Sequence, residues 1–291
     1  MEIKVEGEEI QIQCVYGPAH RRHLEEVLIP TIQRVTDRPI RLCVINFDGG
    51  SKDCISSCRF DRLSVESLPN NSGGVIGFAE GHNLLFSRFC PNNYFAIINP
   101  DCVPQARSID RMIARMGNKG IAIVEGRQWP QEHPKEYDVL SGLTPWASGA
   151  FQLIDAKFYA DVGGMDETYF LYLEDVDLSW RAWLGGWSVV YEPDAVVTHF
   201  SGGPFYRKDI VSREAFYGAR NFIAISRKFF GAQGEERAIE LLLGSVDQDL
   251  AQLAIREYRE KIKNRIAGRE ILQSHPMVKI LGLNQFHEIR K

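Results

Sequence analysis

The feature that most constrains the fold of this chain is a regular alternation of strand-like and helix-like segments over residues 10–126. Short apolar runs that end in turn-forming residues predict strands, and apolar residues three or four positions apart predict helices. The predicted strands are 10–16, 40–47, 63–68, 94–99 and 120–126, and the predicted helices are 23–35, 79–90 and 108–117. This alternation is typical of an α/β domain with a mainly parallel sheet.

The second half of the chain carries a different pattern. Residues 127–147 contain three prolines and predict a surface loop, and Pro30 is expected to break or kink the helix at 23–35. Alternation returns over 148–200, and the pattern beyond residue 203 is helical. One apolar stripe in 247–266 predicts a helix that packs on the domain or forms a homodimer. We therefore expect one α/β domain over 1–204 and a helical C-terminal region over 205–291.

Composition excludes several classes of protein. The 34 basic and 38 acidic residues give a net charge of −4, so no global positive field indicates nucleic acid as a partner. No apolar run approaches the roughly 18 residues that span a bilayer, and the N-terminus lacks the plan of a signal peptide. The six cysteines show no paired C-x-x-C spacing, which indicates reduced thiols and a cytoplasmic protein.

Two acidic residues follow predicted strands. In open parallel sheets ligands bind beyond the carboxyl ends of the strands, where Asp48 can reach a base or a ribose. Asp101, in Asn99-Pro100-Asp101, is a suitable oxygen ligand for Mg²⁺ or Mn²⁺, which would neutralise a departing diphosphate. Both stretches are also ordinary turn sequences, and that structural interpretation stays open.

A third cluster, Glu174, Asp175 and Asp177, lies at the predicted start of a helix whose buried stripe is Val176, Trp180 and Trp183/Leu184. Acids there compensate the helix dipole by about 0.3–1 kcal/mol each. Alternatively, one carboxylate serves as a general base that the dipole keeps ionised. His199, at a later strand end, is a metal ligand only if Asp101 lies nearby.

Other catalytic motifs are missing from the sequence. The run Ser72–Gly77 lacks the first glycine of G-x-G-x-x-G, which weakens a dinucleotide site. The patterns of P-loop enzymes, zinc proteases and serine hydrolases do not occur. These chemistries are therefore not favoured.

Five motifs in one order carry a resemblance to a known family. They are FDGGSKD, NNSGGVIGFAEGHN, INPDCVP, ASGAFQLIDAKFYADVGGMDETYFLYLEDVDLSWRAWLGGW and VVYEPDAVVTHFSGG. Together they resemble the inverting glycosyltransferases of family 2, which have the GT-A fold, and most of all the rhamnosyltransferase-like branch that builds bacterial cell-surface polysaccharides. The resemblance covers residues 40–204 and implies a Rossmann-like, mainly parallel sheet flanked by helices.

The resemblance also implies roles for individual residues. Asp175 of the Glu174-Asp175 pair matches the family's catalytic base, Asp101 its metal-binding acid, and His199 a histidine that completes the metal site in some members. Asn99 replaces the first acid of the family's D-x-D motif, which leaves one charge fewer on the metal. The expected substrate-binding residues are Asp48, Asn71, Gly74, Phe78, Asn83, Asn99, Trp146 and Arg181.

The implied enzyme is a metal-dependent glycosyltransferase that uses Mn²⁺ or Mg²⁺. Its donor would be a dTDP-, UDP- or GDP-linked sugar, and its acceptor a glycan or lipid-linked glycan in polysaccharide or O-antigen assembly. A nucleotidyltransferase of related fold and a non-catalytic nucleotide-sugar-binding module are the alternatives. The basic and aromatic segment 205–230 predicts either peripheral membrane contact at the inner face of the membrane or a helix face packed on the α/β domain.

Overall fold

The computed structural model describes residues 8–50, 54–130, 136–200, 208–266 and 275–286, with side chains from residue 213 onward in the fourth range. Within these ranges nine strands form one sheet, in the order β3-β4-β2-β1-β5-β8-β7-β9-β6. The strands are β1 (Ile10–Tyr16), β2 (Ile40–Asn46), β3 (Cys58–Phe60), β4 (Leu63–Leu68), β5 (Tyr94–Ile98), β6 (Cys102–Pro104), β7 (Ile121–Trp129), β8 (Phe151–Asp155) and β9 (Ser188–His199).

The directions of the strands determine where the predicted site residues lie, because most of these residues follow strand ends. Strands β4, β2, β1 and β5 are parallel, so their carboxyl ends meet at one edge. Strand β8 is antiparallel to β5 and β7, whereas β9 runs parallel to β7. Strand β6 pairs antiparallel with β9 and brings Cys102 opposite His199. The carboxyl ends of β2, β5 and β9 therefore border the same region.

Helices cover both faces of the sheet. One apolar cluster contains residues of α2 (Ile29–Ile32) and α4 (Ser108–Met116), and clusters on the other face contain residues of α3 (Phe78–Phe89), α5 (Ala156–Asp161) and α6 (Glu174–Leu184). The segment before α2 comprises a 3₁₀ turn (Pro18–His20), α1 (Arg21–His23) and a π turn (Leu24–Leu28). The mixed, mainly parallel sheet between helices confirms the predicted fold class.

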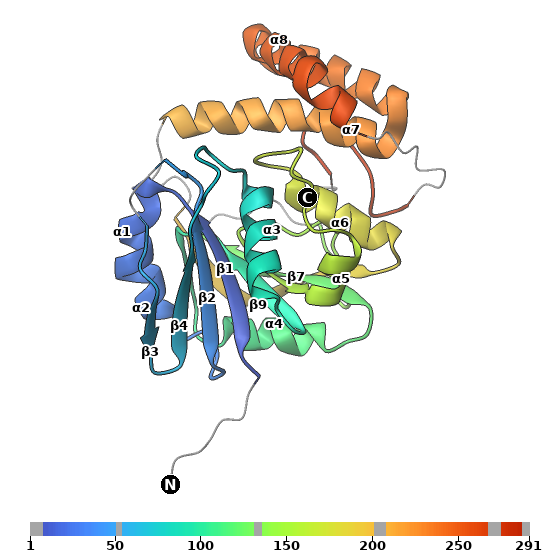
Figure 1. Ribbon diagram of the computed structural model, residues 1–291. Helices are drawn as coiled ribbons and strands as arrows, with labels where there is room; N and C mark the ends of the chain where they lie inside the picture. The colour runs from blue at the N-terminus through green and yellow to red at the C-terminus, as the bar shows by residue number, and fades with distance from the viewer. Residues whose placement is uncertain (1–7, 51–53, 131–135, 201–207, 267–274, 287–291) are drawn as a thin grey trace.

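The C-terminal region packs against α6. Helix α7 (Lys208–Ser245) is interrupted at Gly231 (φ 66°, ψ −153°), and α8 (Gln248–Glu257) follows it. A π turn (Tyr258–Ile262) and a 3₁₀ turn (Lys263–Arg265) come next. In Figure 1, α7 lies across one end of the molecule with α8 beside it. Trp180 of α6, Phe222 of α7 and Tyr258 belong to one buried apolar cluster.

Several details differ from the sequence predictions. Strands β3 and β6 are missing from the predictions because three residues are too few to show periodicity. Strand β7 extends to Trp129, into the predicted loop 127–147, of which 131–135 lie outside the described residues. The helical path continues past Pro30, which occupies the first turn of α2, where its missing N–H costs least. Leu184, predicted in the buried stripe, is 41% exposed.

In the described part of the C-terminal region, the last helical turn ends at residue 265, and 275–286 forms turns closed by isolated bridges. The apolar stripe of 247–266 contacts α7 through Ala254, Tyr258 and Ile262, whereas Leu253 is exposed. This contact favours the alternative in which the stripe packs within the chain over the one in which it forms a homodimer. The division at residue 204 lies outside the described residues and stays a prediction. Among the described helices, none is both long and apolar enough to cross a bilayer.

Candidate active site

The three acids at the start of α6 have different surroundings. Glu174 and Asp177 are 4% and 0% exposed, whereas Asp175 is only half-buried. The two carboxylate oxygens of Asp175 accept hydrogen bonds from the backbone N–H groups of Gly149, at 2.9 Å, and Val176, at 2.8 Å. These bonds fix the orientation of the carboxylate. Asp175 is therefore the acid of this cluster that an incoming substrate can reach.

The segment before α6 has an unusual backbone. Phe170, Tyr172 and Leu173 have φ values of 65°, 69° and 70°, in the left-handed region that bulky residues rarely adopt. Such conformations persist only where surrounding contacts enforce them, and they cluster at functional sites. The carbonyl of Phe170 accepts the N–H of Phe78, at the start of α3. This hydrogen bond joins the segment before the acidic cluster to Phe78, one of the expected substrate-binding residues.

Asp101 and His199 lie together, as a shared metal site requires. Their Oδ1 and Nε2 atoms are 3.4 Å apart, and both side chains are largely buried. The Nδ1 atom of His199 is 2.7 Å from Oε1 of Gln128, a buried residue on the neighbouring strand β7. Because a glutamine oxygen only accepts, Nδ1 of His199 donates in this contact, which fixes the ring with Nε2 directed at Asp101.

The electrostatics at Asp101 favour a carboxylate. Burial alone raises the pKa of Asp101, but the hydrogen bond and charge of His199, together with the charge of His20, outweigh burial and lower the pKa below its usual value. The ligand atoms of Asp101, Cys102 and His199 lie within 4.8 Å of one another. Burial raises the pKa of the Cys102 thiol well above its usual value, which disfavours the thiolate unless a cation is bound. A carboxylate oxygen and an imidazole nitrogen fit a divalent cation such as Mn²⁺.

Two histidines near this site were not predicted from the sequence. Nδ1 of His23 is 2.7 Å from the carbonyl oxygen of Pro100, and the ring of His23 packs edge-on against Phe200. Burial lowers the pKa of His20, and the charge of Asp101 acts against that shift. Both histidines belong to the segment after β1, at the carboxyl edge of the sheet. That position was the signal available in the sequence.

The short segment Gly149–Ala150 connects the candidate metal site, at Asp101 and His199, to the acidic cluster. Gly149 donates to Asp175, and the next residue, Ala150, accepts the N–H of Asn99 at 2.9 Å. Tyr172 lies near both groups: burial raises the pKa of its phenol, and the charges of Glu214, Glu174 and Asp101 raise it further. The residues predicted as base and metal ligand are therefore brought to one region of the structure.

The two loops that carry the expected substrate-binding residues Asp48 and Gly74 are in contact. Asp48 and Val75 form an isolated antiparallel bridge, and the N–H of Gly49 donates to the carbonyl of Gly74 at 2.9 Å. Asn71 is exposed in this turn, whereas the neighbouring Asn70 donates from its side chain to the carbonyl of Phe47. Asp48 and Gly74 thus border one surface at the carboxyl edge of β2, and Asn70 holds the loops together.

Three other predicted substrate residues are engaged within the protein. The Asn83 amide bonds the backbone of Met165 and the carboxylate of Glu167, and so holds the turn at Gly163 and Gly164. The Arg181 guanidinium donates to the carbonyls of residues 162 and 164 and to Asp177. Trp146 is 7% exposed, in the cluster under α7. Asn83, Arg181 and Trp146 thus have partners within the protein, and their role in substrate binding stays a prediction.

The basic residues of 205–230 whose side chains are described mostly face the protein. Arg220 is buried, Arg227 pairs with Glu235, and Lys228 pairs with Asp166 and Asp177. Arg213 is exposed, and Arg207 and the side chain of Lys208 lie outside the described part. The described contacts therefore favour the packing alternative over a surface for lipid headgroups.

Asp177→Asn is expected to lower the free energy of unfolding by about 3 kcal/mol, because it removes one partner from a buried ion-pair network. Asp177 accepts from Tyr169 Oη at 2.9 Å and Arg181 Nε at 2.6 Å, and Lys228 Nζ lies 2.5 Å away. Urea unfolding measures the loss. Glu240→Gln, in the exposed pair with Arg237, is the control and should cost less than about 1 kcal/mol. Equal losses for both variants would contradict the network.

Glu174 does not fit the ionised general base that we expected one acid of this cluster to provide. Its pKa is raised well above the ordinary 4.5, first by burial and then by the negative charge of Asp175. Between about pH 4.5 and the raised pKa, the folded protein therefore holds a proton on Glu174 that the unfolded chain releases. This contribution to stability is complete below about pH 4.5 and is lost as the pH rises through the raised pKa.

Glu174→Gln removes this pH-dependent contribution. We expect the variant to gain stability relative to the unmodified protein between pH 5 and pH 8, measured by urea unfolding at both values. Glu240→Gln changes the same group on the exposed face of α7 and is the control. A Glu174→Gln difference that does not grow with pH would show that Glu174 is ionised in the folded state.

The chain is similar in sequence to two rhamnosyltransferases. The chain is 36% identical over 235 residues to N-acetylglucosaminyl-diphospho-decaprenol L-rhamnosyltransferase of Mycobacterium tuberculosis, covering 65% of this chain and 74% of the relative. It is 24% identical over 207 residues to rhamnosyltransferase WbbL of Escherichia coli, covering 54% and 78%. No protein-family model matches the chain.

Solved structures share the fold at low identity. A mannosyltransferase from Pyrobaculum calidifontis, in complex with GDP-Man and Mn²⁺, superposes with a TM-score of 0.53 at 11% identity, covering 86% of this chain and 68% of that one. GalNAc-T7 with UDP, GalNAc and Mn²⁺ superposes with a TM-score of 0.58 at 10% identity, covering 91% and 58%. At these identities the superpositions support the GT-A fold alone.

Proposed function

This chain belongs to the rhamnosyltransferase-like glycosyltransferases of family 2, and from that premise we propose that it transfers a sugar from a nucleotide-diphosphate donor with Asp175 as general base. One observation carries the residue assignment: Asp175 is the half-buried acid among three, and Gly149–Ala150 connects it by hydrogen bonds to the Asn99–Asp101 turn. A base and a leaving-group site in one region are what a single displacement needs.

The proposed reaction is one displacement. The acceptor hydroxyl oxygen attacks the anomeric carbon of the donor, its proton passes to the carboxylate of Asp175, and the carbon–oxygen bond to the diphosphate breaks. The nucleoside diphosphate leaves from the opposite face, so the configuration inverts. The transition state has oxocarbenium character, as in glycoside hydrolysis. Bonds from Gly149 and Val176 hold the Asp175 carboxylate in place for this transfer.

Asp101 and His199 are the proposed holders of a divalent cation, Mn²⁺ or Mg²⁺. When bound, the cation would supply positive charge to the leaving diphosphate. Gln128 orients His199 for this role through its contact with Nδ1. Asp48 and the Gly74 loop, at the edge of β2, are the proposed contacts of the nucleotide. Phe78, the first residue of α3, and Asn99, which follows β5, are the other proposed residues of the donor side.

The acceptor proposal comes from the Mycobacterium tuberculosis relative, whose name gives an N-acetylglucosaminyl-diphospho-decaprenol acceptor and an L-rhamnosyl donor group. We propose a rhamnosyl donor and a lipid-linked diphosphate glycan acceptor, in assembly of a cell-surface polysaccharide. Membrane contact at the cytoplasmic face would then come through the acceptor lipid, since Arg220, Arg227 and Lys228 face the protein.

A donor screen tests the proposed function. Release of nucleoside diphosphate is measured with dTDP-, UDP- and GDP-sugars, an N-acetylglucosaminyl diphosphate lipid as acceptor, and Mn²⁺ or EDTA. We expect release from one donor that requires both acceptor and cation. Pyrophosphate release from a nucleoside triphosphate and a sugar phosphate would instead identify a nucleotidyltransferase. Binding of a nucleotide sugar without turnover would indicate a non-catalytic module.

A further inference from the structure

The strained segment before α6 is held from the C-terminal helix. Asn221 of α7 is completely buried, and its Nδ2 atom lies 2.9 Å from the carbonyl oxygen of Tyr169 and 2.7 Å from those of Leu171 and Tyr172. One amide group with two hydrogens therefore serves three carbonyls of a single turn. Left-handed residues flank and occupy that turn, so its carbonyls point inward, where helix or sheet partners are missing.

The orientation of the Asn221 amide is fixed by its neighbour. Nε and a terminal nitrogen of Arg220 donate to Oδ1 of Asn221 at 3.0 and 2.9 Å, and the same terminal nitrogen donates to the carbonyl of Tyr169 at 2.6 Å. Because a guanidinium has no acceptor, the amide oxygen faces Arg220 and the NH₂ group faces the turn. Arg220 is itself 5% exposed, which restricts its movement.

A second contact from α7 lies seven residues further on, on the same helix face. Lys228 pairs with Asp166 at 2.7 Å and with Asp177 at 2.5 Å, and so reaches both sides of the segment 166–177. Asp175 lies inside this segment, two residues before Asp177. Helix α7 therefore contacts the backbone before Asp175 through Asn221, and the side chain of Asp177, after it, through Lys228.

We propose that Asn221 is a positioning residue, which holds the turn at 169–172 so that Asp175 meets Gly149 in the orientation needed for proton transfer. The C-terminal helix is then a component of the active site, although it contributes no residue to the chemistry itself. This inference rests on the proposed role of Asp175 as base. Misplacement of a reacting group by about 1 Å costs about 10²-fold in rate, so loss of these bonds should lower turnover strongly.

Two variants of the full-length chain test this role. Asn221→Asp keeps the shape of the side chain but replaces the donor by an acceptor that faces three carbonyl oxygens. Asn221→Ser keeps one donor and introduces no buried charge, so it decides the matter if Asn221→Asp does not fold. We expect kcat to fall about 10²-fold in Asn221→Asp and about tenfold in Asn221→Ser, with KM for the donor changed less than threefold.

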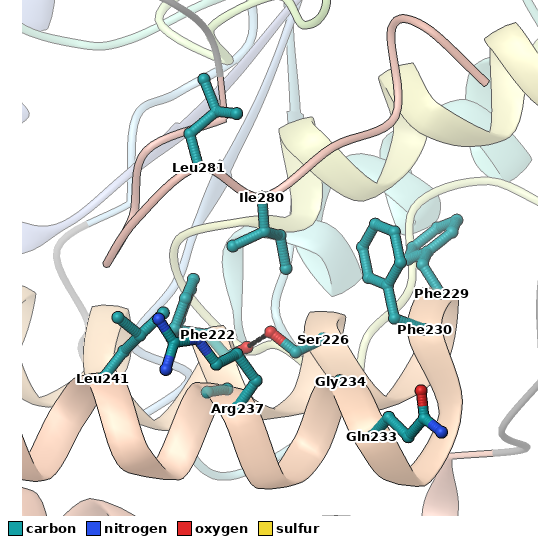
Figure 2. A pocket seen from close by; sticks show the side chains of 11 residues that line it. Phe222, Ser226, Phe229, Phe230, Gln233, Gly234, Arg237, Leu241, Ile280 and Leu281 are labelled. Atoms are coloured by element: carbon teal, nitrogen blue, oxygen red, sulfur yellow. Dashed lines mark hydrogen bonds between the residues drawn. The ribbon is translucent and has the colours of Figure 1, made fainter. Parts of the chain in front are cut away.

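Ser226→Ala is the matched control. Ser226 is also buried on α7, but its hydroxyl donates to the carbonyl of Phe222 within the same helix, beside a cavity of about 620 Å³ between α7 and Ile280–Leu281 (Figure 2). None of the predicted site residues lines this cavity. Wild-type kcat in a folded Asn221→Ser variant would overturn the proposal. So would a parallel loss of kcat, donor affinity and melting temperature, which indicates a scaffold role alone.

Hydrogen exchange separates this inference from the proposed function. We expect the amides of residues 169–175 to exchange faster in Asn221→Ser than in Ser226→Ala, whether or not a donor has been identified. Absence of turnover in the unmodified chain with every donor would refute the proposed function and leave this readout intact. Equal exchange in the two variants would refute the positioning role and leave the proposed function intact.

Discussion

Asp175→Asn should reduce turnover by about 10²–10⁴-fold, the range that a positioned general base contributes. The asparagine amide cannot accept the proton of the acceptor hydroxyl. The hydrogen bonds from Gly149 and Val176 orient the carboxylate before the acceptor binds. The substitution therefore removes a base that is already positioned for proton transfer. Nucleotide-sugar binding should persist, because the proposed contacts of the nucleotide lie at Asp48, Gly74 and Asp101. Single-turnover kinetics and calorimetry measure the two quantities separately.

Asp161→Asn is the control for this substitution. Asp161 ends α5, pairs with Lys157 and has a side chain that is 52% exposed, so the same chemical change occurs away from the acidic cluster. We expect its turnover to match that of the unmodified chain. Asp175→Ala, which places no amide opposite the N–H of Gly149, should behave like Asp175→Asn. Near-normal turnover in both Asp175 variants would remove the base assignment.

Asp101→Asn should lower turnover by about 10²–10³-fold and abolish the effect of Mn²⁺ on nucleoside diphosphate binding. A cation at a departing oxygen supplies several kcal/mol, and each 1.36 kcal/mol is about tenfold in rate. Asparagine keeps the shape of the side chain but carries no charge opposite Nε2 of His199. Titration of the nucleoside diphosphate with and without Mn²⁺ measures the coupling directly.

Cys102→Ala distinguishes the ligands within this cluster. The thiol lies within reach of Asp101 and His199, but burial raises its pKa well above the usual value, and its Sγ atom donates to the carbonyl of Ala150. We expect the variant to bind Mn²⁺ and nucleotide as the unmodified chain does. Loss of metal affinity in Cys102→Ala, with affinity retained in Asp101→Asn, would reverse the assignment of ligands.

Local sequence patterns predicted most of the fold because its elements are long enough to show their period. The predicted strands up to residue 126 correspond to β1, β2, β4, β5 and β7, and the predicted helices correspond to the π turn with α2, to α3 and to α4. The departures have local causes. Strands β3 and β6 contain three residues each, and the π turn at 24–28 precedes a proline that the first turn of α2 accommodates.

The site was harder to predict, because burial and partners come from distant segments. Three acids lie within four residues at the start of α6. The burial of Glu174 and the pairing of Asp177 with Lys228, however, depend on long-range packing. Proximity of Asp101 and His199 depends on the register between β6 and β9. Asn83 has the polarity of a ligand-binding residue, but its amide bonds the turn at Met165, 82 positions away.

The stereochemistry of the transferred sugar tests the central claim most directly. Proton NMR of the product, formed from an anomerically pure nucleotide sugar, gives the configuration at the new glycosidic bond. Deprotonation of the acceptor by Asp175 opposite the departing diphosphate predicts a configuration opposite to that of the donor. A product that retains the donor configuration would contradict the single displacement and the role of Asp175 in it.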